Sequence, residues 1–175
     1  MQNVRYIVTI IIVICLTSVA AMGFDPLTAT IRVSNSCLYD YVILGKHPQA
    51  TDGFDNAYDT ISPGNLNADM GQPFISVIIT HTEWKPAMRE MRGDIRSMAI
   101  KQEWQLAITS TLPKGTPLTV ELQTEGTTLP KGVKLTLKDK KKEIDLKVGN
   151  YTIQAPGPET TSKLLVIAEQ PKSGD

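Results

Sequence analysis

The chain has 175 residues, in which 18 lysine and arginine residues balance 18 aspartate and glutamate residues. A neutral balance creates no long-range field toward nucleic acid or an anionic lipid surface, so it argues against partners of those classes. Once an exported N-terminus is set aside, about 150 residues remain, enough for one two-layer domain. Eleven prolines, 12 glycines and a 6% aromatic content favour strands and turns over packed helices.

The first 23 residues have the layout of a secretory signal peptide. Arg5 lies in a short polar start, residues 6–16 are almost wholly apolar, and small residues follow as far as Gly23. We therefore predict that residues 1–23 are removed and that the protein is secreted, in an extracellular or periplasmic location. A retained anchor is the alternative, because about 19 apolar residues just span a bilayer. The membrane is a partner only in that case.

The remaining chain is predicted to be a β-sandwich domain over residues 24–170, followed by a polar tail at 171–175. Cys37 is the one cysteine that removal of the signal would leave, so no disulfide is expected inside the domain. A small buried hydrophobic residue is the simplest interpretation of Cys37, and an intermolecular disulfide is the other.

From Thr28 onward apolar residues recur mostly at every second position, which places them on one face of a strand. Turn residues such as Pro113-Lys-Gly and Pro130-Lys-Gly separate the runs. The expected strands are residues 28–33, 38–44, 74–80, 95–100, 104–108, 118–122, 133–137, 144–148, 151–153 and 164–168. Short strands at this spacing predict an all-β fold, a single immunoglobulin-like β-sandwich with Trp104 in its core.

One expected strand is apolar on both faces. In residues 38–44, Tyr39, Tyr41 and Ile43 alternate with apolar residues that point the other way. This pattern predicts either a central strand covered on both sides or a contact with a neighbouring molecule.

A long stretch with little periodicity, residues 46–73, is a candidate functional loop because few compact domains carry one of this length. Three carboxylates and an amide fall close together in it: Asp52, Asp55, Asn56 and Asp59. Hard oxygen donors are what calcium requires, so these residues are the candidate calcium ligands. Three later residues would complete the site if the loop folds back: Asn65, Asn67 and Asp69.

The spacing of these residues does not fit an EF-hand, which needs ligands at alternate positions and a final glutamate. The other interpretation is a structured turn in which aspartate side chains accept hydrogen bonds from nearby backbone amides. Calcium is the one cofactor that the sequence brings into consideration.

Several motifs resemble modules of secreted bacterial and archaeal surface proteins. They are Val42-Ile-Leu-Gly, Ala50-Thr-Asp-Gly-Phe-Asp, Tyr58-Asp59, Asp94-Ile-Arg96 and Trp104-Gln-Leu106. In those modules a strand ending in glycine leads to an Ala-Thr-Asp-Gly-Phe/Tyr-Asp loop, which precedes an immunoglobulin-like sandwich. This chain departs from them in lacking a strongly proline-rich stretch after the acidic loop. The resemblance implies an exported location and that fold, and such modules have no agreed activity.

No motif in the sequence points to catalysis. His47 and His81 lack metal-ligand spacing, and neither a Gly-x-Ser-x-Gly turn nor a phosphate-binding loop occurs. We therefore expect that the protein is not an enzyme. Arg92-Gly93-Asp94 is the tripeptide that integrins read in host proteins, although three common residues also meet by chance.

These observations favour an exported, non-catalytic structural or interaction module of the cell envelope, extracellular matrix or a surface filament. Its expected partners are other extracellular or envelope proteins and copies of itself. In the filament version, residues 28–33 would pair with an exposed sheet edge of another copy. The alternative is a calcium-dependent carbohydrate-binding module, in which exposed Tyr58 and Trp84 stack on sugar rings.

Overall fold

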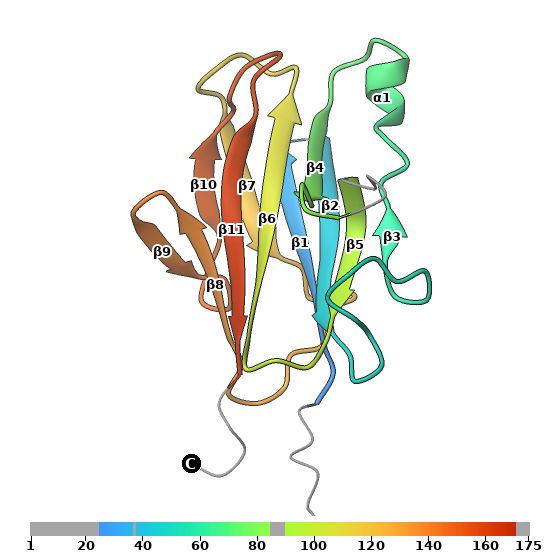
Figure 1. The fold of residues 1–175 in the computed structure, drawn as a ribbon. Helices are drawn as coiled ribbons and strands as arrows, with labels where there is room; N and C mark the ends of the chain where they lie inside the picture. Colours follow the sequence, from blue (N-terminus) through green and yellow to red (C-terminus); the bar gives the residue numbers. More distant parts are fainter. Residues whose placement is uncertain (1–24, 37, 85–89, 171–175) are drawn as a thin grey trace, which may run out of the picture.

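The computed structural model describes residues 25–36, 38–84 and 90–170, and these are built mainly of strands (Figure 1). The predicted all-β class is confirmed: the strands form one mixed sheet of 11 strands that is nearly closed into a barrel. The predicted signal segment 1–23, Cys37 and the tail 171–175 lie outside the described residues. Within the described ranges, no helix has the length and apolar character that a membrane crossing requires.

The sheet follows an order that differs from the order of the chain. It runs β10-β7-β1-β2-β5-β4-β6-β11-β8-β9, with β3 paired to β5. β2 and β5 are parallel, and the other paired strands are antiparallel. The elements are β1 (Leu27–Asn35), β2 (Leu38–Lys46), β3 (Thr60–Ile61), α1 (Leu66–Asp69), β4 (Ile75–Thr80), β5 (Glu90–Arg96), β6 (Lys101–Ser110), β7 (Pro117–Leu122), β8 (Lys134–Asp139), β9 (Lys142–Asp145), β10 (Tyr151–Gln154) and β11 (Ser162–Glu169).

The sheet curls so that its two halves face each other. Figure 1 shows β4, β6 and β11 in front of β1, β2 and β7. The alternation of each strand turns one set of side chains into the space between the halves, as with Leu27, Ala29, Ile31 and Val33 of β1. Trp104 is fully buried there, as the sequence predicted.

The expected strands agree with the structure except at two places and inside the long loop. The strand expected at residues 144–148 ends early, because β9 covers Lys142–Asp145 and a turn follows in which Val148 is 85% exposed. Residues 95–100 were expected to form a strand, but β5 lies earlier, at Glu90–Arg96, and Ile100 is 47% exposed in the following turn. The apolar periodicity predicts the wrong bounds for β5 because Asp94, a charged residue, occupies a buried position of this strand. Residues 46–73 contain β3 and the short helix α1, which their composition did not predict.

β1 lies inside the sheet, paired with β2 on one side and β7 on the other. Residues 28–33 therefore already have strand neighbours on both edges. Pairing with another copy through this segment would require strand exchange, not simple addition to a free edge.

β5 changes its neighbour partway along its length. Met91 pairs with Ile79 of β4, whereas Gly93 pairs with Ile43 of β2, and β3 pairs with β5 at both positions. β2 and β4 therefore diverge around β5. The place where they diverge, beside Asp40 and Arg92, is called the seam below.

Two charged side chains join the strands across the seam. Asp40 Oδ2 accepts a 2.8 Å hydrogen bond from the backbone N–H of Val77 in β4. Arg92 donates to Asp40 Oδ1, to the Tyr41 carbonyl and, at 3.5 Å, to the Val77 carbonyl. The Arg92 and Asp40 side chains are only 12% and 11% exposed. The pair thus satisfies backbone groups that have no strand partner there, and leaving each one unpaired would cost about 1–3 kcal/mol.

The two ends of the sheet also meet through side chains. The Tyr151 hydroxyl of β10 donates to Asp139 Oδ2, at the end of β8, over 3.1 Å. Lys142 of β9 places its ammonium group 5.9 Å from the centre of the Tyr151 ring. These contacts, and not a backbone ladder, bring the terminal strands together.

We expect Arg92→Met and Asp40→Leu each to lower the free energy of unfolding by about 3–5 kcal/mol, because each leaves a buried charge unpaired. The double variant should lose less than the sum of the two, since it removes both charges. Urea unfolding of the four proteins measures this coupling. Glu143→Gln, which breaks the exposed Lys138–Glu143 pair, is the control and should unfold like the wild type. Additive losses would contradict this role of the seam.

Candidate functional site

The predicted calcium ligand Asp52 anchors the acidic loop to the turn after β5. Its Oδ1 accepts hydrogen bonds from the Ser97 N–H and hydroxyl and from the Gln102 amide, at 3.2, 2.7 and 2.9 Å. Burial acts to raise the pKa of Asp52, but these hydrogen bonds, together with Arg96, outweigh it and the net pKa is lowered. Asp52 therefore holds the loop in place as a carboxylate.

Asp55 and Asp59 lie together in a tight turn. Asp59 Oδ2 accepts from the Asp55 N–H at 2.7 Å, and its Oδ1 accepts from the Ile95 N–H at 3.0 Å. Asp55 Oδ1 accepts from the Ala57 N–H at 3.0 Å. Burial raises the pKa of Asp59; its backbone hydrogen bonds lower it in part, and the Asp94 and Asp55 carboxylates raise it further.

Asp55 and Asp59 thus accept hydrogen bonds from backbone amides, as the structured-turn interpretation predicted, whereas Asp52 also binds the side chains of Ser97 and Gln102. The structure brings Asp55 and Asp59 together and ties Asp52 to Ser97, while Asn56 is exposed. In residues 25–36, 38–84 and 90–170, no group of three or more His, Cys, Asp or Glu side chains is arranged to hold a metal ion. Calcium binding at Asp52, Asp55, Asn56 and Asp59 stays a prediction.

The residues expected to complete the calcium site serve another purpose. The Asn65 side chain caps α1 by accepting from the backbone N–H groups of Asn67 and Ala68. Its amide group donates to the Ile75 carbonyl over 2.9 Å, which ties α1 to β4. Asp69 lies in the first turn of the same helix. These contacts fix the position of α1.

The aromatic residues predicted to stack on sugars are already stacked within the chain. Tyr58 lies against His47 with 4.6 Å between ring centres, and Trp84 lies against His81 at 3.6 Å with only 7° between the rings. Tyr58 and Trp84 are partly buried, so the prediction that they are exposed is wrong. The sequence pattern could not show that each ring has a histidine partner.

His81 lies buried between two carboxylates. Its Nε2 is 2.8 Å from Asp94 Oδ2, and its Nδ1 is 2.9 Å from Glu83 Oε1. Arg96 Nε donates to the same Asp94 oxygen at 3.0 Å. Burial acts to lower the pKa of His81, but the hydrogen bonds to Asp94 and Glu83 outweigh it and the net pKa is raised. A protonated His81 and Arg96 together balance the two carboxylates.

This cluster resembles a catalytic arrangement in its residue types but not in its accessibility. A general acid or base must reach a proton of its substrate, whereas both nitrogens of His81 are taken and one ring face is covered by Trp84. Asp94 is also the third residue of the Arg92-Gly93-Asp94 tripeptide. Because Asp94 is 1% exposed and Arg92 is held in the seam, the tripeptide is not displayed for an integrin.

The outer face of β2 carries the main exposed aromatic surface among the described residues. Tyr39 is 59% exposed and Tyr41 is 41% exposed, and they are the two aromatic members of the exposed large hydrophobic residues. Being two residues apart in a strand, they stand on the same face about 6.6 Å apart along the strand. Arg32 of β1 lies 4.4 Å from the centre of the Tyr39 ring, and Arg92 lies 5.3 Å from that of Tyr41.

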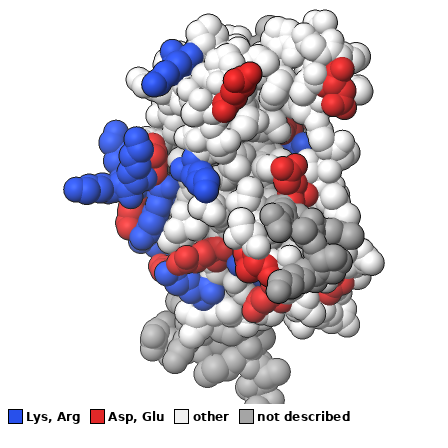
Figure 2. All heavy atoms as spheres, turned by 45° about the horizontal axis from the view of Figure 1, so that its top comes forward, with Lys and Arg blue, Asp and Glu red and all other residues white. Residues whose placement is uncertain are grey.

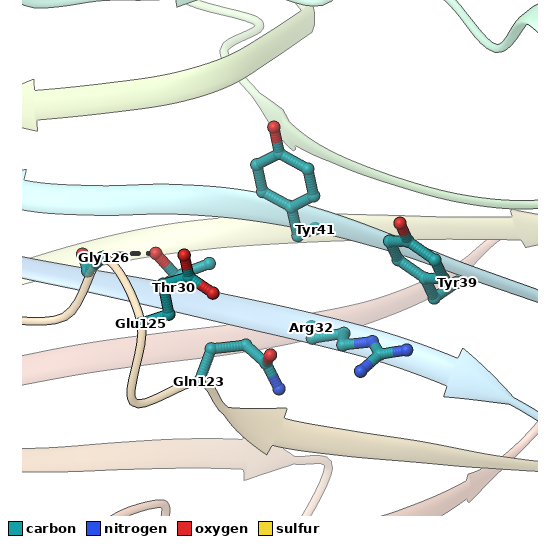
Figure 3. Close-up of a pocket in the computed structure, with 7 residues that line it drawn as sticks. All are labelled: Thr30, Arg32, Tyr39, Tyr41, Gln123, Glu125 and Gly126. Atoms are coloured by element: carbon teal, nitrogen blue, oxygen red, sulfur yellow. Dashed lines mark hydrogen bonds between the residues drawn. The ribbon is translucent and has the colours of Figure 1, made fainter.

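A loop that follows β7 forms a wall across β1 from these tyrosines, as Figure 3 shows. The groove between them has a volume of about 460 Å³, within the range of about 300–1,000 Å³ that small-molecule sites occupy. We call it the tyrosine groove. Its lining consists of Thr30, Arg32, Tyr39, Tyr41, Gln123, Glu125 and Gly126.

The wall of the tyrosine groove is fixed to β1. The backbone N–H of Thr30 donates a 3.0 Å hydrogen bond to the Thr127 hydroxyl oxygen. The Thr30 hydroxyl donates to the Gly126 carbonyl at 3.3 Å. Gly126 has a φ of 71°, and a Cβ there would lie 3.0 Å from the Thr30 hydroxyl oxygen. A larger residue at 126 would therefore push the wall away from β1.

A concentration of positive charge lies elsewhere. Figure 2 shows lysine and arginine side chains gathered on one side of the molecule, where the β8–β9 hairpin projects. The hairpin carries Lys138, Lys140, Lys141 and Lys142, and Lys138 is paired with Glu143 at 2.7 Å. Acidic side chains lie among these lysines, so the patch is mixed in sign.

Sequence reasoning identified part of the tyrosine groove and missed the rest. The two-sided pattern of residues 38–44 pointed to Tyr39 and Tyr41, but nothing in it indicated Gln123 or Glu125, which the sheet order brings to the same place. The buried His81 and Asp94 were also missed, since a charged residue gives no sign of burial until its partners are known.

No protein-family model, no curated protein and no solved structure matches the chain.

We expect stability to fall with rising pH because of His81. The folded-state pKa of His81 is raised above its ordinary value of 6.5. The contribution of His81 to the free energy of unfolding is therefore fully present below about pH 6.5. It is lost as the pH rises through the folded-state pKa. Urea unfolding at about pH 6 and about pH 9 should show this decline in the wild type and a smaller one in His81→Gln. Equal declines in both proteins would contradict the assignment.

Proposed function

We propose that the protein is an exported, non-catalytic interaction module that binds components of the cell envelope or extracellular matrix through the tyrosine groove. The observation that carries this proposal is the exposure of Tyr39 and Tyr41 on one face of β2. Of the two interpretations of this strand, coverage from both sides and contact with another molecule, the second fits a face that the described chain leaves open. Tyrosine is also among the residues that dominate binding energy at interfaces.

The non-catalytic part of the proposal is supported by the state of the ionisable side chains. His81 and Asp94 are enclosed and bonded to each other, and Asp52 is taken up by Ser97 and Gln102. Lys46 is 1% exposed and donates to the Ala99 carbonyl at 3.0 Å. Each of these groups has a structural role that explains its position without a reaction.

The exported location rests on the signal layout of residues 1–23, and the immunoglobulin-like description rests on the way two halves of the sheet enclose a core. Partners of the module are other extracellular or envelope components, copies of the chain included. A calcium-dependent mode of binding through Asp52, Asp55, Asn56 and Asp59 belongs to the alternative of a carbohydrate-binding module. It is distinguished by adding a chelator to the binding assay below.

The test uses the protein recovered from the exported fraction of its producing cells and an envelope preparation from the same cells. We expect wild type to sediment with the envelope and the double variant Tyr39→Ala, Tyr41→Ala to bind at least about 30-fold more weakly, because two residues of hot-spot character are removed. The apparent Kd is measured by sedimentation at increasing envelope concentration.

Val148→Ala provides the matched control, since Val148 is 85% exposed but lies outside the tyrosine groove. It should bind like the wild type. Equal binding by the tyrosine variant and the wild type, or no binding by either, would contradict the proposed function. Loss of wild-type binding in chelator would favour the calcium-dependent alternative.

A further inference from the structure

The side chains that line the tyrosine groove limit the kinds of ligand that it can bind. The side chains that line it are aromatic, polar or charged, and no aliphatic side chain larger than the threonine methyl is among them. Protein interfaces are enriched in tyrosine and arginine, but they are depleted in glutamate and their centres are more apolar than this lining. A ligand that suits this groove must instead offer an apolar face to a tyrosine ring and hydrogen-bonding groups to the surrounding side chains.

The hydrogen-bonding groups of the lining suit a ligand that is rich in hydroxyls. Arg32 provides donors, Glu125 provides acceptors, and the Gln123 amide provides both. A hydroxyl can donate and accept at once, so it can use any of these neighbours. A sugar ring combines such hydroxyls along its edge with a face of C–H groups, which can lie against an aromatic ring.

The lining of the groove carries one positive and one negative side chain, Arg32 and Glu125. Arg32 also lies 3.7 Å from Glu121 of β7, which is outside the lining. An anionic ligand would meet the Glu125 carboxylate, and a cationic one would meet Arg32. A neutral ligand is repelled by neither group, so the charges of the lining favour a neutral ligand.

Contacts within the chain also hold the side chains of the groove in place without a ligand. Two hydrogen bonds that Thr30 donates, to the Gly126 carbonyl and to the Thr127 hydroxyl, fix the wall, and Arg32 lies over the Tyr39 ring. Tyr41 is supported from the seam, where Arg92 bonds to its carbonyl and lies beside its ring. Fixed side chains reduce the entropy that binding would otherwise cost.

Taking these features together, and resting on the function proposed above, we propose that the tyrosine groove is a binding site for a neutral glycan. Two successive sugar units lie along β2, one against Tyr39 and one against Tyr41. Gln123 and Glu125 form hydrogen bonds with their hydroxyls from the wall. The acidic loop and the rings of Tyr58 and Trp84 take no part, which separates this site from the one that the sequence suggested.

The envelope assay is extended by treating the envelope with periodate, which cleaves the C–C bond of vicinal diols in sugars and is itself reduced to iodate. We expect periodate to abolish the binding that depends on Tyr39 and Tyr41. In 1 M NaCl, binding should stay within about twofold of its low-salt value, because a neutral ligand is not subject to ionic screening. Protease treatment distinguishes a polysaccharide, which survives it, from a glycan attached to protein.

Variants of the wall test the site without touching the buried core. Gln123→Ala with Glu125→Ala should weaken binding by about tenfold, since two hydrogen-bonding side chains are lost. Tyr39→Phe with Tyr41→Phe should bind within about threefold of wild type if ring contact carries the affinity. Val148→Ala again serves as the control.

The possible results separate the two proposals. If binding needs the tyrosines but survives periodate and is lost to protease, the glycan assignment is overturned and the proposed function stands. Strong loss of binding in 1 M NaCl would overturn the neutral assignment. If the double tyrosine-to-alanine variant binds like the wild type, both proposals are overturned. Loss after periodate, with or without sensitivity to protease, is the result that the glycan site predicts.

Discussion

The ion pair between Asp40 and Arg92 is the interaction on which the rest of the structure depends. It lies where β2 and β4 diverge around β5, and it bonds to backbone groups of both strands. A sheet edge buried without partners would leave strong donors and acceptors unsatisfied. The Asp40 carboxylate and the Arg92 guanidinium are both largely buried. They take the place of the missing hydrogen bonds between strands and also bond to each other. This allows one continuous sheet to fold over and enclose a single core.

β5 connects this seam to both sites described above. Arg92 supports Tyr41 through its carbonyl and its ring, so the seam reaches the floor of the tyrosine groove. Two residues later, Asp94 faces inward and accepts from His81 and Arg96. The N–H of Ile95, between Asp94 and Arg96, donates to the Asp59 carboxylate. One short strand therefore connects the seam, the groove and the acidic loop.

The part of this fold that the sequence could predict is the part set by local periodicity. Alternating apolar residues predict β1, β2, β4, β6, β7, β8, β10 and β11, and Trp104 takes the core position expected of it. β5 was displaced in the prediction because Asp94 occupies an inward position that normally belongs to an apolar residue. Its burial depends on His81 and Arg96, and His81 lies in a segment before the strand.

The same distinction applies to the candidate site. Tyr39 and Tyr41 follow from their spacing, since residues two apart share a face of a strand. The wall could not be predicted, because Gln123 and Glu125 reach β1 only through the order β7-β1-β2 in the sheet. The acidic loop shows the opposite case. Its composition indicated oxygen ligands, but Ser97, Gln102 and backbone amides elsewhere in the fold use those oxygens.

The central claim is that Asp40 and Arg92 hold β2 against β4, and amide hydrogen exchange tests it most directly. Under native conditions, Arg92→Met should lose protection first at the Val77 amide and along residues 38–42, while β6 and β11 keep theirs. The wild type should protect the Val77 amide as strongly as an amide within a strand ladder. If Val77 exchanges freely in the wild type, or if its protection is the same in Arg92→Met, the seam does not have the role described here.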